Sequence, residues 1–143
     1  YIDLDSLIEK LAKKTINQIF SDNGEEEFRE LETNCLKETI KIPSLVIATG
    51  GGIVETPQNW GILRQGIIIW LDVDKNIVIK RLKDDIENRP LLQEGNLNNL
   101  YTNILKSRKN LYSQADIKIE INNENVEEVS EKIIYALYKK INN

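Results

Sequence analysis

The stretch SLVIATGGGIV, residues 44–54, joins a largely apolar run directly to three glycines. An apolar run without polar alternation indicates a strand buried on both faces, which is typical of a parallel sheet. Gly50, Gly51 and Gly52 then follow at the carboxyl end of that strand. Because these residues lack Cβ atoms, a ligand could approach main-chain N–H groups that bind phosphate, hydroxyl or carboxylate oxygens. A flexible turn is the alternative interpretation of the three glycines.

Outward from this stretch, the spacing of apolar residues predicts strands that alternate with helices along the whole chain. This alternation indicates one α/β domain over residues 1–143, with a parallel sheet and helices on both of its faces. A capping box is expected at Asn23 and Glu26. The segment at about 86–98 lacks periodicity, and we interpret it as a lid. The predicted strands are 1–4, 44–50, 66–73 and 115–121, and the predicted helices are 6–20, 23–40, 57–65, 74–85, 100–114 and 125–141.

Composition excludes several classes of function. The chain has one cysteine, Cys35, and no histidine, so it can form no internal disulfide and no Cys–His nucleophile pair, and a zinc site is not expected. The net charge of −4 and the lack of a basic stripe argue against binding to nucleic acid. No apolar run approaches the roughly 20 residues of a membrane helix, so a membrane association is not expected.

Two carboxylates follow the first predicted strand. Ligands of parallel sheets bind at the carboxyl ends of strands, which is where Asp3 and Asp5 lie in the sequence. One carboxylate there could help to hold a hydrated Mg²⁺, and the other could accept a proton from a substrate hydroxyl. The alternative is that Asp5 only caps the next helix.

Arginines are rare in this lysine-rich chain, which has fourteen lysines and five arginines. Each arginine is therefore a candidate for a role that needs a planar, bidentate fork. Arg29 shares a helix face with Glu32, with a surface ion pair as the alternative. Arg108 lies in a lysine-rich stretch, and Arg81 lies in a predicted helix. For both, the alternative to a functional role is a place on a solvated helix face. Arg89 lies in the predicted lid.

Six motifs, taken together and in order, resemble the shikimate kinase family of P-loop small-molecule kinases, and the resemblance covers nearly all of the chain. It implies a three-layer, P-loop kinase-like α/β fold with a parallel sheet of order 2-3-1-4-5. The implied activity is transfer of the γ-phosphoryl group of ATP to the 3-hydroxyl of shikimate, with Mg²⁺, by a cytoplasmic monomer of bacteria or a plastid homologue. The motifs are IDLD (2–5), FRELE (28–32), ATGGGIV (48–54), WLDV (70–73), RPLL (89–92) and SRKNLY (107–112).

The resemblance also implies roles for single residues on the shikimate side of the site. Asp5 would bind the reacting hydroxyl and take its proton. Arg29 and Arg108 would grip the shikimate carboxylate, and Glu32 would hold Arg29 in place. Gly50, Gly51 and Gly52 would form the backbone surface against the shikimate ring.

On the nucleotide side, the resemblance implies that Arg89 closes on the phosphates and that Arg81 lies beside the adenine. Asp3 would lie near Mg²⁺ and contact it through water. No G-x-x-x-x-G-K-[ST] phosphate loop occurs in the 143 residues. We therefore expect an N-terminally truncated chain, without the first strand, the phosphate loop and the first helix of the family.

Three interpretations of the function follow. The first is a shikimate kinase. The second is a shikimate-binding homologue without catalysis, or an inactive fragment, because the phosphate loop is missing from the sequence. The third, a dinucleotide-dependent oxidoreductase, is weakly supported because GGGIVE, residues 50–55, does not match G-x-G-x-x-G.

Overall fold

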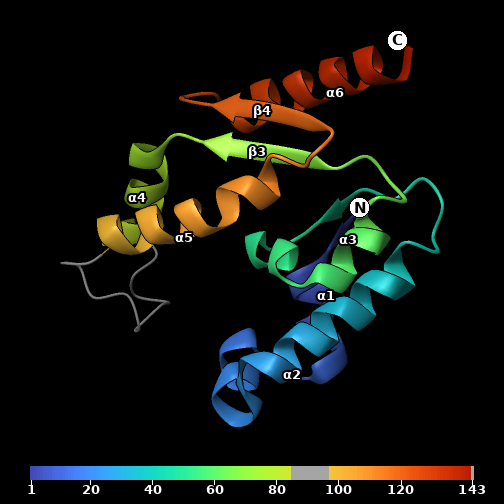
Figure 1. Cartoon of the computed structure of the whole chain (residues 1–143), viewed down its shortest axis with the longest axis vertical. Helices are drawn as coiled ribbons and strands as arrows, with labels where there is room; N and C mark the ends of the chain where they lie inside the picture. The colour runs from blue at the N-terminus through green and yellow to red at the C-terminus, as the bar shows by residue number, and fades with distance from the viewer. Residues whose placement is uncertain (85–96, 143) are drawn as a thin grey trace. The chain divides into compact units, whose positions relative to one another are not determined.

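The computed structural model of the chain describes residues 1–84 and 97–142, so most of the predicted lid and its Arg89 lie outside the described residues. The chain forms two compact units, residues 1–66 and 67–143. Each unit contains one pair of parallel strands with helices packed beside it (Figure 1). Among the described residues, no helix is both long and apolar enough to cross a membrane.

The first unit is built around the pairing of β1 with β2. Ile2 of β1 lies opposite Ile47 of β2, and Asp3 lies opposite Ala48. The strand predicted at 44–50 is therefore shortened to two residues. Its start is prevented by Ser44, which has a φ of 57°, outside the extended region. The elements of the unit are β1 (Ile2–Asp3), α1 (Leu4–Ala12), α2 (Ile16–Thr39), β2 (Ile47–Ala48), the 3₁₀ helix η1 (Gly51–Glu55) and α3 (Pro57–Leu63).

The single helix predicted over 6–20 is wrong, because the chain turns between α1 and α2. Lys13 ends α1 in the left-handed conformation, with φ 54° and ψ 31°. Thr15 then begins α2 with a capping box, in which Thr15 Oγ1 accepts from the N–H of Gln18 and Gln18 Oε1 accepts from the N–H of Thr15. The box predicted at Asn23 and Glu26 is thus replaced by one eight residues earlier.

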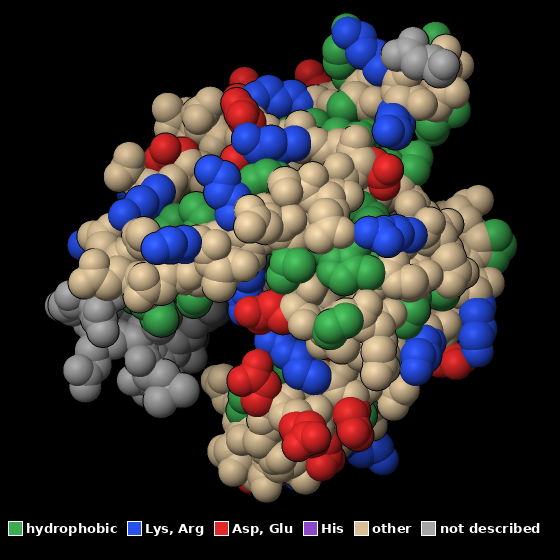
Figure 2. Space-filling view, in the orientation of Figure 1, with side chains coloured by type: hydrophobic (Ala, Val, Ile, Leu, Met, Phe, Trp, Pro, Cys, Tyr) green, Lys and Arg blue, Asp and Glu red, His purple; other side chains and the backbone are tan. Residues whose placement is uncertain are grey.

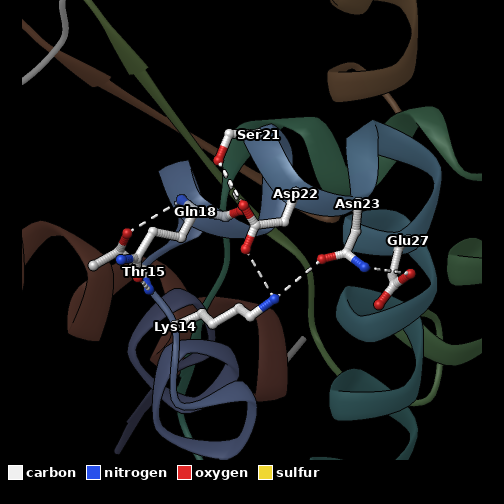
Figure 3. Close-up of polar contacts among 7 residues, drawn as sticks. All are labelled: Lys14, Thr15, Gln18, Ser21, Asp22, Asn23 and Glu27. Carbon is white, nitrogen blue, oxygen red and sulfur yellow. Dashed lines mark hydrogen bonds and ion pairs between the residues drawn. The ribbon is translucent and has the colours of Figure 1, made fainter.

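A kink at Gly24 divides α2, since Gly24 has the non-helical angles φ 85° and ψ 176°. Polar side chains span this kink (Figure 3). Lys14 Nζ lies 2.9 Å from Asp22 Oδ2 and donates to Asn23 Oδ1, whose amide nitrogen donates in turn to Glu27. Hydrogen bonding and charge from Lys14 lower the pKa of Asp22. These contacts orient the second part of α2, which carries the Arg29 and Glu32 side chains.

Apolar side chains of all three helices fill the core of the first unit. The fully buried members come from α1 and both parts of α2, and Phe20 packs on Phe28 across the kink at a ring-centroid distance of 4.8 Å. The glycine-rich turn and α3 close the core with Ile53 and Trp60. The other core residues include Leu4, Ile8, Ile19 and Leu36.

The second unit contains β3 (Ile69–Val73), α4 (Lys75–Asp84), α5 (Leu97–Tyr112), β4 (Ile117–Ile121) and α6 (Val126–Asn142). The two strands are parallel and pair along five residues, from Ile69 opposite Ile117 to Val73 opposite Ile121. Trp70 of β3 stacks on Tyr112 of α5 with ring centroids 5.6 Å apart. These contacts join the strand pair to α5.

The expected α/β class with parallel strands is confirmed. In the expected order 2-3-1-4-5, the numbers are those of the family's five strands, of which β1, β2, β3 and β4 would be strands 2, 3, 4 and 5. The observed pairs, β1 with β2 and β3 with β4, therefore match the neighbours 2-3 and 4-5 of that order. Each pair belongs to its own unit, and the single domain expected over 1–143 stays a prediction.

Candidate functional site

The two aspartates at the end of β1 have different environments. Asp3 is the N-cap of α1, where its Oδ1 accepts from the N–H of Ser6 at 2.9 Å. The interpretation of Asp5 as the helix cap is therefore wrong, because Asp5 lies within the first turn of α1. A Cβ atom on Gly50 would lie 3.6 Å from Asp5 Oδ1 and 3.9 Å from Glu32 Oε1. The Asp5 carboxylate of α1 and the Glu32 carboxylate of α2 thus both lie next to Gly50, the first residue of the glycine run.

Arg29 forms the cationic centre of this cluster. Its Nη1 donates to Glu32 Oε2 at 2.9 Å, and the Glu32 side chain is only 1% exposed. Its Nη2 donates to Glu25 at 3.2 Å and lies 3.8 Å from Glu55 Oε2. Burial lowers the pKa of the Arg29 guanidinium, but bonds and charges from Glu32 and Glu25 outweigh it, so the net shift is upward. Arg29 is therefore a permanent cation.

The glycine run lies directly against this guanidinium. A Cβ atom on Gly52 would lie 2.6 Å from Arg29 Nη2 and 2.7 Å from Nη1, distances that real Cβ atoms do not show. Among the described glycines, a positive φ occurs at Gly24 and not at the run. Gly52 is thus required by space rather than by backbone conformation, and the run forms the 3₁₀ helix η1 instead of an irregular turn.

A buried polar network holds η1 in place. The Asn59 side chain, which is fully buried, donates from Nδ2 to the carbonyl of Ile53 at 3.0 Å. Its Oδ1 accepts from Thr33 Oγ1 at 2.9 Å, which links α3 to α2 one residue after Glu32. Trp60 Nε1 donates to the carbonyl of Val54 at 3.0 Å. These hydrogen bonds connect η1 to α3 and α3 to α2.

The first unit therefore brings together five of the predicted site residues, namely Asp5, Arg29, Glu32, Gly50 and Gly52. A fixed guanidinium next to a carboxylate and a bare backbone can bind a ligand that carries both a carboxylate and hydroxyl groups.

Comparison with known proteins identifies the family. A sequence model of the family described as shikimate kinase matches residues 1–138. The chain belongs to the shikimate kinase family. The resemblance seen in the six motifs is thereby confirmed.

Relatives of the shikimate kinase family resemble the chain over most of its length. It is 48% identical over 130 residues to the shikimate kinase of Prochlorococcus marinus strain NATL2A, which covers 91% of this chain and 66% of the relative. It is 46% identical over 138 residues to that of Microcystis aeruginosa, which covers 96% of this chain and 72% of the relative. The chain therefore spans about two thirds of the length of these relatives.

Solved shikimate kinases share the fold. The enzyme from Acinetobacter baumannii, in complex with shikimate, matches with a TM-score of 0.88 and 35% identity over 96% of this chain and 77% of that one. The enzyme from Bacteroides thetaiotaomicron matches with a TM-score of 0.85 and 28% identity over 99% of this chain and 83% of that one. The expected P-loop kinase-like fold is thus confirmed.

The other predicted site residues of this shikimate kinase family member are Arg108, Arg81, Gly51, Arg89 and Asp3. Arg108 is half-buried on α5 and Arg81 is exposed on α4, both in the second unit. Gly51 is exposed at the start of η1, and Arg89 lies outside the described residues. In the described part of the chain, no cluster of three or more His, Cys, Asp or Glu side chains could hold a metal ion. The role of Asp3 toward Mg²⁺ stays a prediction.

Sequence reasoning missed four residues that contact the site, which are Glu25, Thr33, Glu55 and Asn59. The pairing of Glu55 with Arg29 joins residues 26 positions apart and has no sequence signal. The contact between Thr33 and Asn59 likewise joins residues 26 positions apart.

Proposed function

We propose that the protein is a shikimate kinase, which transfers the γ-phosphoryl group of ATP to the 3-hydroxyl of shikimate. Membership of the family supports the reaction. The observation that carries the proposal is the Arg29 guanidinium, held by buried Glu32 beside Asp5 and the backbone of η1. We also propose that the protein acts as a cytoplasmic monomer.

The first unit would supply most of the residues on the shikimate side of the site. Arg29 would bind the carboxylate of shikimate with paired N–H groups, together with Arg108 from α5. Asp5 would accept the hydrogen bond of the reacting hydroxyl and take its proton as the oxygen attacks the γ-phosphorus and ADP leaves. Gly50, Gly51 and Gly52 would face the ring. Fixing these groups in advance lowers the entropic cost of reaching the reactive geometry.

The nucleotide side rests on fewer residues of this chain. Arg89 would neutralise charge on the transferred group, and Arg81 would lie beside the adenine. One oxygen of Asp3 accepts from the N–H of Ser6, and the other would accept from a water of hydrated Mg²⁺, an ion that would balance the charge of the phosphates. Because the sequence has no G-x-x-x-x-G-K-[ST] loop, we expect the chain itself to bind ATP poorly.

Calorimetric titration with shikimate tests the proposal. We expect the chain to bind shikimate, and Arg29→Lys to weaken binding at least about tenfold because the paired donors are lost. Arg64→Lys, the same change at an arginine on the far end of α3, is the matched control and should leave binding unchanged. Equal affinities of the Arg29→Lys variant and the unchanged chain would contradict the assignment of Arg29.

A second measurement separates the kinase from a non-catalytic shikimate-binding homologue. ADP formation from Mg²⁺ and ATP is followed with and without shikimate. Shikimate-dependent ADP formation that Asp5→Asn abolishes supports the kinase. Shikimate binding without any ADP formation, also in a longer form of the protein that matches the full length of its relatives, supports the binding homologue.

A further inference from the structure

Three carboxylates surround the single charge of Arg29. Glu32 accepts from Nη1, while Nη2 donates to Glu25 at 3.2 Å and lies 3.8 Å from Glu55. All three contacts lie within the first unit. A ligand carboxylate would need paired N–H groups of this guanidinium. One of these donors, Nη2, is already hydrogen-bonded to a carboxylate of the chain.

The contacts of Arg29 with Glu32 and with Glu25 differ in how easily they break. Glu32 is 1% exposed, and removing a buried partner would leave an uncompensated charge, so this pair is permanent. Glu25 is 66% exposed, and the water around it can replace the arginine at little cost. Glu25 is therefore the exchangeable partner of Arg29.

The position of Glu25 favours its exchange. It directly follows Gly24, where the backbone of α2 leaves helical geometry, and it is one turn before Arg29. Glu26 and Glu27 beside it are exposed as well. Figure 2 shows acidic side chains gathered at the lower end of the view, where the first part of α2 lies. The negative potential of this surface repels an incoming anion. It also repels the Glu25 carboxylate and so weakens its contact with Arg29.

We propose that Glu25 is an internal substitute for the substrate carboxylate: it occupies Nη2 of Arg29 in the ligand-free protein and is displaced when a carboxylate ligand binds. The inference rests on the proposed function of Arg29. It makes Glu25 a determinant of specificity, because only a ligand whose paired oxygens bind the fork better than one exposed glutamate displaces it. Glu25 lowers the affinity for shikimate and keeps the guanidinium in place until shikimate arrives.

The test compares Glu25→Gln with Glu26→Gln by calorimetric titration with shikimate. Both variants lose one negative charge on neighbouring positions of α2, but only Glu25 contacts Arg29. We expect Glu25→Gln to bind shikimate about three- to fivefold more tightly, the range that an exposed ion pair allows. Glu26→Gln should change affinity less than about twofold, since its charge is screened by solvent.

A neutral ligand supplies the second control. Methyl shikimate lacks the carboxylate charge, so the Glu25→Gln variant should gain nothing with this ester. Weaker binding of shikimate by Glu25→Gln, or equal gains in both variants, would overturn the inference while leaving the proposed function intact. If the unchanged chain and both variants all fail to bind shikimate, the proposed role of Arg29 fails, and the inference fails with it.

Discussion

Gly52 lies against the guanidinium of Arg29 so closely that a Cβ atom on Gly52 would be 2.6 Å from Arg29 Nη2. The absence of a side chain at this position is thus explained by a contact within the chain, before any ligand is considered. Buried Glu32 holds Nη1 of the same guanidinium, which would lie 2.7 Å from that Cβ, so a shift of Arg29 away from the Cβ strains or breaks this pair. The position of the Arg29 side chain therefore depends on the absence of a side chain at Gly52.

Gly52→Ala should therefore displace Arg29. We expect shikimate affinity to fall about tenfold or more, and the free energy of unfolding to fall by about 1–2 kcal/mol, as is common for overpacking. Calorimetric titration and urea unfolding measure the two effects. The control is Gly61→Ala in α3, where nothing lies within 4 Å of an added Cβ and the helix gains about 0.5–1 kcal/mol. Unchanged affinity in Gly52→Ala would contradict the contact.

The Thr33–Asn59 pair should contribute to the stability of the first unit. Thr33→Val keeps the shape of the side chain but removes the donor to Asn59 Oδ1, which costs about 1–2 kcal/mol. Asn59→Ala also leaves the Ile53 carbonyl without this donor and should cost about 2–3 kcal/mol. Urea unfolding of both variants and of the double variant measures their coupling. Strictly additive losses would show that the two side chains do not act together.

The turn before helix α6 contains an acidic group, Glu124, whose titration should affect stability. Hydrogen bonding from Lys132, and then from the N–H of Asn122, lowers the pKa of Glu124 from 4.5 to about 2. A carboxylate with a lowered pKa stabilises the folded state at a pH above 4.5, and this contribution is lost as the pH falls from 4.5 to about 2. Melting temperatures of the unchanged chain and of Glu124→Gln should therefore differ at neutral pH and converge in acid.

A difference between those two melting temperatures that stays constant from neutral to strongly acidic pH would show that Glu124 does not act through its charge. Lys132→Gln is the companion variant. It should lose the larger share of the pH-dependent stability, because it removes the first cause of the pKa shift while the backbone hydrogen bond from Asn122 remains.

The parts of the fold that the sequence could predict have local signals. Helix α3 begins at Pro57, as expected for a first-turn proline, and the apolar runs locate β3 and β4 to within a few residues. The Arg29–Glu32 pair follows from a spacing of three on one helix. The start of the first helix was predicted less well. Helix α1 begins two residues earlier than expected, so Asp3 is its N-cap and Asp5 lies within its first turn.

Other features depend on contacts between distant residues. The break between α1 and α2 is an exception, because it has a local signal. Thr15 and Gln18 match the capping-box pattern. The step of five from Leu11 to Ile16 also departs from helical spacing. No glycine or proline marks the break. The contacts of Asn59 with Thr33 and of Glu55 with Arg29 arise only when α3 and η1 pack on α2. A spacing rule within one helix cannot detect them.

That break between the helices yields a further prediction. Lys13 has φ 54°, a left-handed conformation that costs a residue with a Cβ atom about 1 kcal/mol and that glycine adopts freely. Lys13→Gly should therefore raise the free energy of unfolding by about 0.5–1 kcal/mol, even after its added freedom in the unfolded chain. Lys10→Gly, within α1, should lower it by about 1 kcal/mol. Urea unfolding measures both, and a loss of stability in both variants would contradict a left-handed Lys13.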